Sequence, residues 1–262
     1  MIHMSVDVLI FAGQSNMVGT TEGLPSANEA VENALEYRFL EDALIPLRHP
    51  VGENIGDRLL LGANNGHGGL APDFCRAYTN KTGKKVVAIH TARGDTRLDE
   101  WLKGTERFDA MVKKIKAGIQ KARELGEIDK IYLIWLQGES DAIYRTPGEV
   151  YKQRLTAFKN DLKNQAGIEK FAVIEVGYFC NTVTQHWLRD RTREEGKRDD
   201  EVIMRAQEEL PGEDDDFVLL TDICKKLSLI PSHLNPAAPG HYANSAMTLI
   251  GTEAGESLAK LG

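Results

Sequence analysis

The chain has 262 residues, and 42% of them are hydrophobic, which is enough to bury the core of a single α/β domain spanning residues 1–262. The formal net charge is −7, and acidic and basic residues are mixed along the chain. This pattern argues against nucleic acid or an anionic membrane as a partner. The three cysteines are widely spaced, so neither a disulfide framework nor a zinc cluster is indicated. Separately, we expect no cofactor.

The first residues give little sign of a targeting signal. Residues 1–5 lack the charged region and the small-residue cleavage site of a secretory leader. No stretch approaches the roughly 20 apolar residues that a membrane-spanning helix needs. We therefore expect a cytoplasmic protein, or a secreted one if a leader was removed from it.

Apolar runs predict five strands, and helical patterns lie between them. The predicted strands are 6–11, 85–91, 131–136, 171–178 and 217–220. Each run is nearly continuously apolar, as is typical of strands that are covered on both faces. Helices are predicted at 72–82, 105–125, 146–166, 199–210 and 240–261, with a capping box at Thr146. Segment 20–69 shows little periodicity and is expected to be either a substrate-binding lid or a surface excursion.

The alternation of strands and helices predicts a fold class. Connections long enough for crossovers favour a three-layer α/β/α sandwich around a central, mostly parallel five-stranded sheet, flavodoxin-like in outline. In such sheets, ligands bind at the carboxyl ends of the strands. The functional residues should therefore lie in segments 13–19, 92–101, 137–142 and 179–189 and near His233.

Directly after the first strand comes the sequence Gly-Gln-Ser-Asn-Met at 13–17. A serine in a sharp turn between a buried strand and a helix has an exposed hydroxyl, and its N–H lies at a helix N-terminus, where negative charge is stabilised. Ser15 is therefore a candidate nucleophile. A serine that only caps the helix fits this short motif equally well, so support must come from other segments.

Three further blocks lie at the ends of later elements. Ala92-Arg93-Gly94 opens a segment that closes on Trp101, Gln-Gly-Glu-Ser occupies 137–140, and Ser-His-Leu-Asn-Pro-Ala-Ala-Pro-Gly-His-Tyr occupies 232–242. With these blocks, in this order, the chain resembles the SGNH hydrolases. Within them, it is most similar to the acetylxylan esterases of carbohydrate esterase family 6 and the sialate O-acetylesterase-like proteins. The resemblance implies a metal-free serine mechanism that removes acetyl groups from sugars.

Carried over by position, the resemblance assigns roles to several residues. Ser15 would be the nucleophile, and His233 would be the general base. The backbone N–H groups of Ser15 and Gly94 would form the oxyanion hole. Relatives in the wider superfamily add an Asn side chain from the third block, where this chain offers Gln137, whose amide could instead be satisfied by backbone groups at the strand end.

The chain departs from the family pattern at the acid that usually orients the histidine. That acid lies three residues before the base, where this chain has Ile230. We expect Glu139 to replace it, with Asp141 and Asp222 as the next candidates. The alternatives are a backbone carbonyl, which would leave a Ser–His dyad, or a protein that has lost activity. His67 and His241 are expected to be loop or capping residues.

Substrate contacts are expected from residues that flank the nucleophile and from aromatic side chains. Gln14 and Asn16 adjoin Ser15, and Trp101 and Trp187 could stack on a sugar ring, although core packing explains Trp101 as well. The predicted function is an esterase that deacetylates carbohydrates, acetylated xylan before sialic acid. A carbohydrate-binding protein without catalysis and a hydrolase of longer acyl chains are the alternatives.

Overall fold

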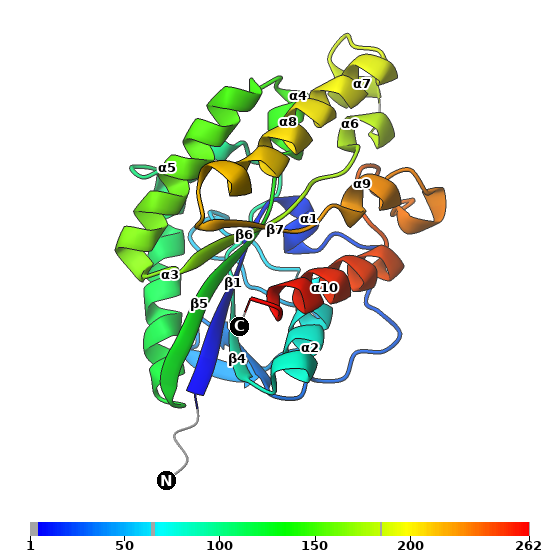
Figure 1. Cartoon of the computed structure of the whole chain (residues 1–262). Helices are drawn as coiled ribbons and strands as arrows, with labels where there is room; N and C mark the ends of the chain where they lie inside the picture. The colour runs from blue at the N-terminus through cyan, green and yellow to red at the C-terminus, as the bar shows by residue number, and fades with distance from the viewer. Residues whose placement is uncertain (1–4, 64–65, 184, 262) are drawn as a thin grey trace.

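A computed structural model describes residues 5–63, 66–183 and 185–261, and a twisted sheet runs through its centre (Figure 1). The sheet has seven strands in the order β3-β2-β4-β1-β5-β6-β7. They are β1 (Ser5–Gly13), β2 (Ala34–Arg38), β3 (Ala43–Pro46), β4 (Lys85–His90), β5 (Glu127–Leu136), β6 (Lys170–Ile174) and β7 (Phe217–Thr221). Neighbouring strands are parallel, except that β2 and β3 pair antiparallel.

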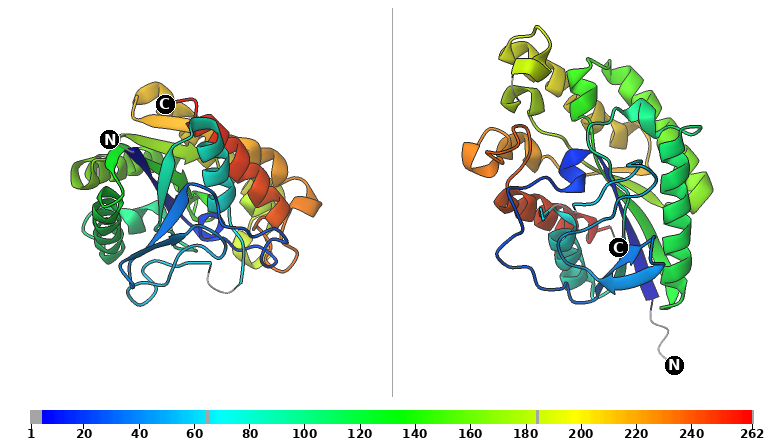
Figure 2. Two further views of the ribbon diagram at one scale, coloured as in Figure 1. Left: turned by 90° about the horizontal axis from the view of Figure 1, so that it is seen from below. Right: turned by 180° about the vertical axis from the view of Figure 1, so that it is seen from behind.

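Helices cover both faces of this sheet, so the expected three layers are present. Figure 1 shows α3 and α5 on one side and α2 and α10 on the other, and Figure 2 shows the same layers from below and from behind. The longer helices are α2 (Ala71–Thr82), α3 (Glu106–Arg123), α5 (Gly148–Ala166), α8 (Arg193–Glu213) and α10 (Asn244–Leu258). The short ones are α1 (Ser15–Val18), α4 (Glu139–Ile143), α6 (Phe179–Thr182), α7 (Gln185–Leu188) and α9 (Ile223–Leu227), with 3₁₀ turns η1 (Leu98–Trp101) and η2 (Pro231–His233). In the described ranges, no helix is both long and apolar enough to cross a membrane.

The expected number of strands was wrong, because the hairpin of β2 and β3 lies inside segment 20–69. Charged residues interrupt the apolar pattern of β2, and Glu36 is one of them. Its side chain is nevertheless fully buried, where it accepts a 2.7 Å hydrogen bond from the Gly52 N–H and pairs with Arg38 at 3.4 Å. The predicted capping box was also wrong, since the Thr146 hydroxyl donates to Asp141 instead of accepting from the first turn of α5.

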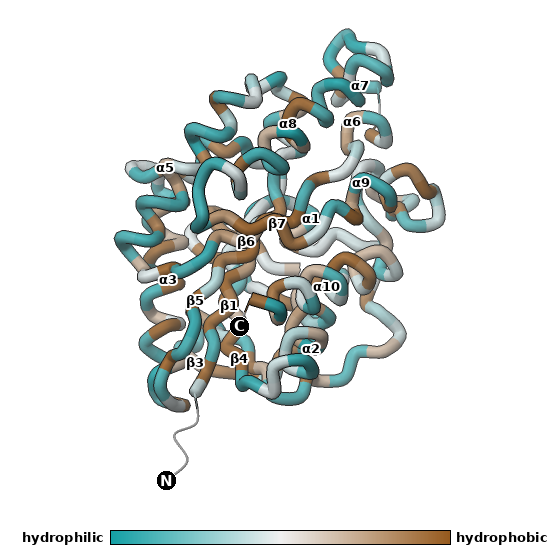
Figure 3. Tube along the Cα trace, in the orientation of Figure 1, coloured by the Kyte–Doolittle hydropathy of each residue, from teal (hydrophilic) through white to brown (hydrophobic). Residues whose placement is uncertain are grey.

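The core lies between the sheet and the helices, where the apolar residues gather (Figure 3). An unbroken series of aromatic rings crosses from α5 into the sheet. The ring centroid of Phe158 lies 5.2 Å from that of Trp135 and 5.9 Å from that of Phe171. The centroid of Phe171 lies 5.3 Å from that of Phe217. Trp101 joins the series through an edge-to-face contact with Trp135 at 5.5 Å. This packing fixes β5 and β6 relative to η1, and therefore fixes the loops at their carboxyl ends.

The strand order locates the most favourable place for a binding site. β1 lies between β4 and β5, so the chain continues to opposite sides of β1 when it forms these two strands. Such a switch point leaves a crevice beyond the carboxyl ends of the strands. The segments that follow β1, β4 and β5 meet in this crevice, and they carry Ser15, Gly94 and Glu139.

Candidate active site

Ser15 is held at the end of β1 by a turn that packs tightly against β5. Gly13 has a φ of +144°, and a Cβ atom there would lie only 2.0 Å from the carbonyl oxygen of Leu136. The N–H of Gln14 donates to that same oxygen at 2.9 Å. Only glycine allows this approach, and the turn places Ser15 at the first position of α1.

The Ser15 hydroxyl forms a hydrogen bond with a histidine from the far end of the chain. His241 Nε2 lies 2.8 Å from Ser15 Oγ, and His241 Nδ1 lies 3.1 Å from the carbonyl oxygen of Ala238. Because a carbonyl can only accept, Nδ1 carries the ring proton and Nε2 keeps a lone pair directed at Ser15. Burial lowers the pKa of His241 below its usual value near 6.5, against the opposing effect of the Ala238 and Pro239 carbonyls. The imidazole is therefore neutral at pH 7.

The prediction that His233 lies at Ser15 was wrong, and so was the expectation that His241 is only a loop or capping residue. His233 is half-buried, and its Nδ1 lies 3.4 Å from Ser245 Oγ. Leu234 and Tyr242 pair in an isolated bridge that closes the intervening residues into a compact loop. That bridge places His241, and not His233, toward the nucleophile.

Glu139 does not contact either histidine. Its side chain is 2% exposed, and its Oε1 accepts a 2.8 Å hydrogen bond from Asn16 Nδ2. The prediction that Glu139 orients the base was therefore wrong. Asp141 is no substitute, because it accepts from Leu98 N–H at 2.8 Å and from Gln137 Nε2 at 2.6 Å. Asp222 lies at the start of α9 and has no hydrogen bond to a histidine in the described ranges.

Two backbone N–H groups are placed to receive an oxyanion. Gly94 packs against the nucleophile so closely that a Cβ atom there would lie 3.3 Å from the Ser15 Cβ. Within the described ranges, neither the Gly94 N–H nor the Ser15 N–H donates a hydrogen bond. Both donors are therefore free for a ligand beside the Ser15 hydroxyl.

The predicted third donor, Gln137, points elsewhere. It is fully buried, and its Nε2 donates to the Thr96 carbonyl oxygen at 2.9 Å and to Asp141 at 2.6 Å. That expectation was wrong, because the backbone and Asp141 satisfy the amide inside the protein.

Gln14, and not Gln137, has a side-chain amide donor available beside Ser15. Its Oε1 accepts from the N–H groups of Gly138 and Ser140, at 3.4 Å and 3.1 Å, which fixes which end of the amide is oxygen. In the described part of the chain, nothing accepts a hydrogen bond from its Nε2. Gln14 lines the same cavity as Ser15 and His241.

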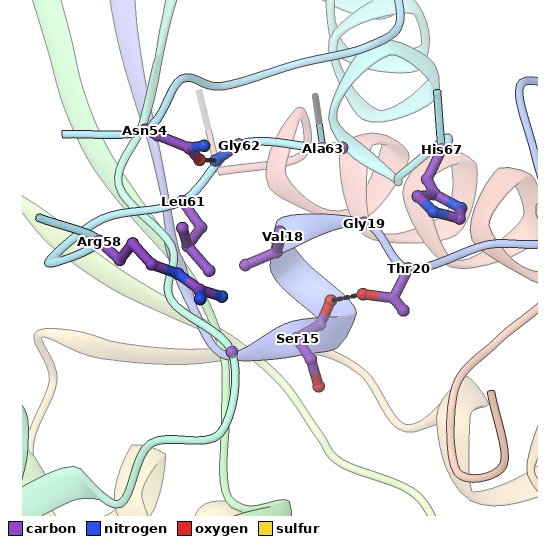
Figure 4. A pocket seen from close by; sticks show the side chains of 11 residues that line it. Ser15, Val18, Gly19, Thr20, Asn54, Arg58, Leu61, Gly62, Ala63 and His67 are labelled. Carbon is purple, nitrogen blue, oxygen red and sulfur yellow. Dashed lines mark hydrogen bonds between the residues drawn. The ribbon is translucent and has the colours of Figure 1, made fainter. Parts of the chain in front are cut away.

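Two cavities meet at Ser15. The first, about 520 Å³, is lined by Thr20, Asn54, Arg58, His67 and Gly94 among others. Figure 4 shows Arg58 and His67 on opposite sides of it, with Ser15 between them. The second, about 310 Å³, is more apolar and includes His241 together with Gln14, Ile143, Phe179, Val183 and Trp187.

The aromatic and polar residues expected to bind substrate have different surroundings. Trp187 is 42% exposed and lines the second cavity. Trp101 was wrongly expected there, since it is fully buried in the core and its Nε1 donates to Thr96 Oγ1 at 3.0 Å. Asn16 was also wrongly expected to bind substrate, because it is 1% exposed and both ends of its amide contact the protein.

Solved structures with the same architecture support the fold. A protein from Arabidopsis thaliana superposes with a TM-score of 0.71 at 17% identity, covering 98% of each chain. NanS superposes with a TM-score of 0.65 at 17% identity, covering 100% of this chain and 98% of its own. A lipase/acylhydrolase from Enterococcus faecalis gives a TM-score of 0.53 at 10% identity, covering 98% and 97%. At these identities the likeness shows the fold alone.

Sequence comparison identifies the family. No curated protein sequence matches the chain. The model of the family described as "Carbohydrate esterase, sialic acid-specific acetylesterase" matches residues 5–227. This match includes Ser15, Gly94 and Glu139 and ends before the loop that carries His241. The chain therefore belongs to this family of carbohydrate esterases.

Proposed function

We propose that the protein is a serine esterase that removes O-acetyl groups from sugars, with Ser15 as nucleophile and His241 as general base. The observation that carries this proposal is the 2.8 Å contact between Ser15 Oγ and His241 Nε2, at the meeting point of two cavities. A hydroxyl activated by a neutral imidazole, beside free N–H groups, is the arrangement that acyl transfer requires.

The first half of the reaction forms an acyl-enzyme. Ser15 Oγ attacks the acetyl carbonyl carbon while its proton passes to His241 Nε2. The negative charge that develops on the carbonyl oxygen is stabilised by the N–H groups of Ser15 and Gly94 and by Gln14 Nε2. Each such donor contributes on the order of 3 kcal/mol to lowering the barrier. The C–O bond to the sugar then breaks, and the sugar oxygen takes the proton from Nε2.

The second half releases acetate. Water gives a proton to His241 Nε2 and attacks the acetyl carbonyl carbon, and the same donors receive the oxyanion. Collapse of this intermediate breaks the bond to Ser15 Oγ, which recovers its proton from the imidazolium.

The orienting group in this cycle is the Ala238 carbonyl, so Ser15 and His241 act as a dyad. A carbonyl fixes the ring tautomer as a carboxylate does, but it stabilises the imidazolium less because it carries no full charge. The absence of an acid at Ile230 no longer argues for a protein that only binds sugars, since His233 is not the histidine at Ser15.

Release of acetate from an acetylated sugar by the wild type, and not by Ser15→Ala, tests the proposal. Binding without release would contradict it.

For the sugar, the first cavity favours an acidic one over the acetylated xylan that sequence alone suggested. Arg58 lines that cavity, and it forms no ion pair or side-chain hydrogen bond with the residues that the structure describes. Among the residues that the structure describes, no acidic side chain lines the cavity, although the protein carries a net charge of −7. A guanidinium that lacks a protein partner is suited to a carboxylate. An O-acetylated sugar acid, such as the sialic acid of the family description, is therefore the favoured substrate.

This preference is tested by comparing two substrates. We expect kcat/KM to be higher for O-acetylated sialic acid than for acetylated xylo-oligosaccharides. Arg58→Gln should lower kcat/KM about 10- to 100-fold for the first substrate, because hydrogen bonds to a charged group contribute about 1.5–3 kcal/mol. The same change should leave the second substrate nearly unaffected. Equal losses on both substrates, or a wild type that prefers xylo-oligosaccharides, would contradict the preference.

A further inference from the structure

Asn16 connects the nucleophile helix to the backbone on both sides of His241. Its Nδ2 lies 3.5 Å from the Gly240 carbonyl oxygen, and its Oδ1 lies 3.4 Å from the Tyr242 N–H. Asn16 directly follows Ser15 in α1. A single rigid amide therefore relates the position of the Ser15 hydroxyl to that of the imidazole ring.

Glu139 holds this amide from the opposite side. Its Oε1 accepts from Asn16 Nδ2 at 2.8 Å, the shortest of the three contacts that the Asn16 side chain makes. Both side chains are almost fully buried, at 2% and 1% exposed. A carboxylate that accepts from Nδ2 leaves Oδ1 to face the Tyr242 N–H, so Glu139 selects one of the two orientations of the amide.

The loop that carries His241 needs such a fixed point. Gly240 has a φ of +85°, and a Cβ atom there would lie 2.4 Å from the Phe179 ring, so the chain makes a tight, glycine-dependent bend just before the histidine. The imidazole itself is packed edge-to-face against Phe179 at 5.7 Å. A small displacement of Gly240 or Tyr242 would lengthen the Ser15–His241 hydrogen bond.

We infer that Glu139 and Asn16 are positioning residues, which set the distance between Ser15 and His241 through the backbone at Gly240 and Tyr242. The inference rests on the proposed function. It assigns Glu139 a geometric role and not that of the charged partner of the histidine. Burial raises the pKa of the Glu139 carboxyl, and the influences on the pKa of His241 come from its own burial and from the carbonyls of Ala238 and Pro239.

The experiment compares a variant that keeps the hydrogen bond with variants that remove it. Glu139→Gln retains an acceptor for Asn16 without the charge, and we expect kcat on p-nitrophenyl acetate to stay within about threefold of wild type. Glu139→Ala and Asn16→Ala should each lower kcat about 10- to 100-fold with little change in KM, since misplacement by about 1 Å can cost 100-fold. The double variant should be no slower than Asn16→Ala alone, because both changes remove one connection.

Tyr78→Phe is the matched control. It removes a buried 2.7 Å hydrogen bond to Asp7 that lies away from Ser15, and it should lower the melting temperature without lowering kcat. If Glu139→Gln is as slow as Glu139→Ala, and the apparent pKa in kcat/KM also shifts, the carboxylate charge acts on the imidazole and the inference is wrong. Wild-type kcat in Glu139→Ala and Asn16→Ala, with lowered melting temperatures, would overturn it as well.

A second readout does not depend on turnover. In nitrogen-15 spectra of labelled histidine, with His241 assigned from His241→Asn, the Nε2 signal reports its hydrogen bond to Ser15. Ser15→Ala gives the reference for a lost bond. Asn16→Ala and Glu139→Ala should move the signal toward that reference, while Glu139→Gln should not. An inactive wild type would refute the proposed function, and the spectra would still decide the positioning role.

Discussion

The structure predicts that catalysis depends on His241 and not on His233. His241→Asn replaces the ring by a smaller side chain that cannot act as a base, and it removes the 2.8 Å contact with Ser15 Oγ. Loss of a general base costs about 10²- to 10⁴-fold in rate, which corresponds to about 3–5 kcal/mol of transition-state stabilisation. We therefore expect kcat/KM for p-nitrophenyl acetate at pH 7 to fall by that factor.

His233→Asn is the matched control for this change. His233 is half-buried, and its ring nitrogen contacts only Ser245 Oγ, at 3.4 Å, in the described ranges. Because this contact involves neither Ser15 nor His241, we expect kcat/KM within about twofold of wild type. A substitution near the surface also changes stability by only about 0.5 kcal/mol or less. Both variants should show unfolding transitions close to that of wild type. An inactive His233→Asn beside an active His241→Asn would refute the assignment of the base.

Three further predictions follow from burial and hydrogen bonding. Because burial lowers the pKa of His241 below 6.5 and the neutral ring is the base, the midpoint of the acid limb of kcat/KM should lie below pH 6.5; a midpoint above pH 6.5 would contradict this. Gln14→Ala should lower kcat about 10²- to 10³-fold, as expected for an oxyanion donor, whereas Gln137→Ala should mainly lower the melting temperature; equal losses of kcat would argue against the choice of donor. Burial raises the pKa of Glu175 from 4.5 to about 8, although Lys225, at 4.0 Å, acts in the opposite direction. Between these two pH values the folded state holds a proton that the unfolded state has lost. Stability should then fall as the pH rises through this window, by up to about 1.4 kcal/mol per pH unit, and Glu175→Gln should remove that slope in urea unfolding followed from pH 5 to pH 9.

Much of the architecture could be predicted because the central strands are continuously apolar. The run that forms β1 and the stripe that forms α3 are set by burial alone, and both patterns are local. The hairpin of β2 and β3 was not predicted because the charged residue Glu36 interrupts the apolar pattern of β2. Glu36 is buried because Arg38 and the Gly52 N–H pair with it, and the apolar pattern of β2 does not reveal this pairing. The fold therefore follows from apolar periodicity wherever buried charges do not interrupt it.

The site was predictable on its N-terminal side and not on its C-terminal side. Ser15 and Gly94 follow strands directly, so their places in the crevice depend on short turns. The histidine depends instead on the bridge between Leu234 and Tyr242, a contact within an irregular loop. Spacing from a family pattern suggested His233, whereas this bridge brings His241 to the nucleophile. The glycine before His241, which the bend requires at a φ of +85°, was the one local sign of a constrained position.

Covalent capture of the nucleophile tests whether His241 activates the Ser15 hydroxyl. A fluorophosphonate reacts with a serine only where a neighbouring base activates its hydroxyl, and mass spectrometry of the digested protein locates the label. We predict one label, on the peptide that contains Ser15, with a rate unchanged in His233→Asn and reduced at least 100-fold in His241→Asn. A label on another serine, or equal labelling of Ser15 in the two histidine variants, would contradict the account.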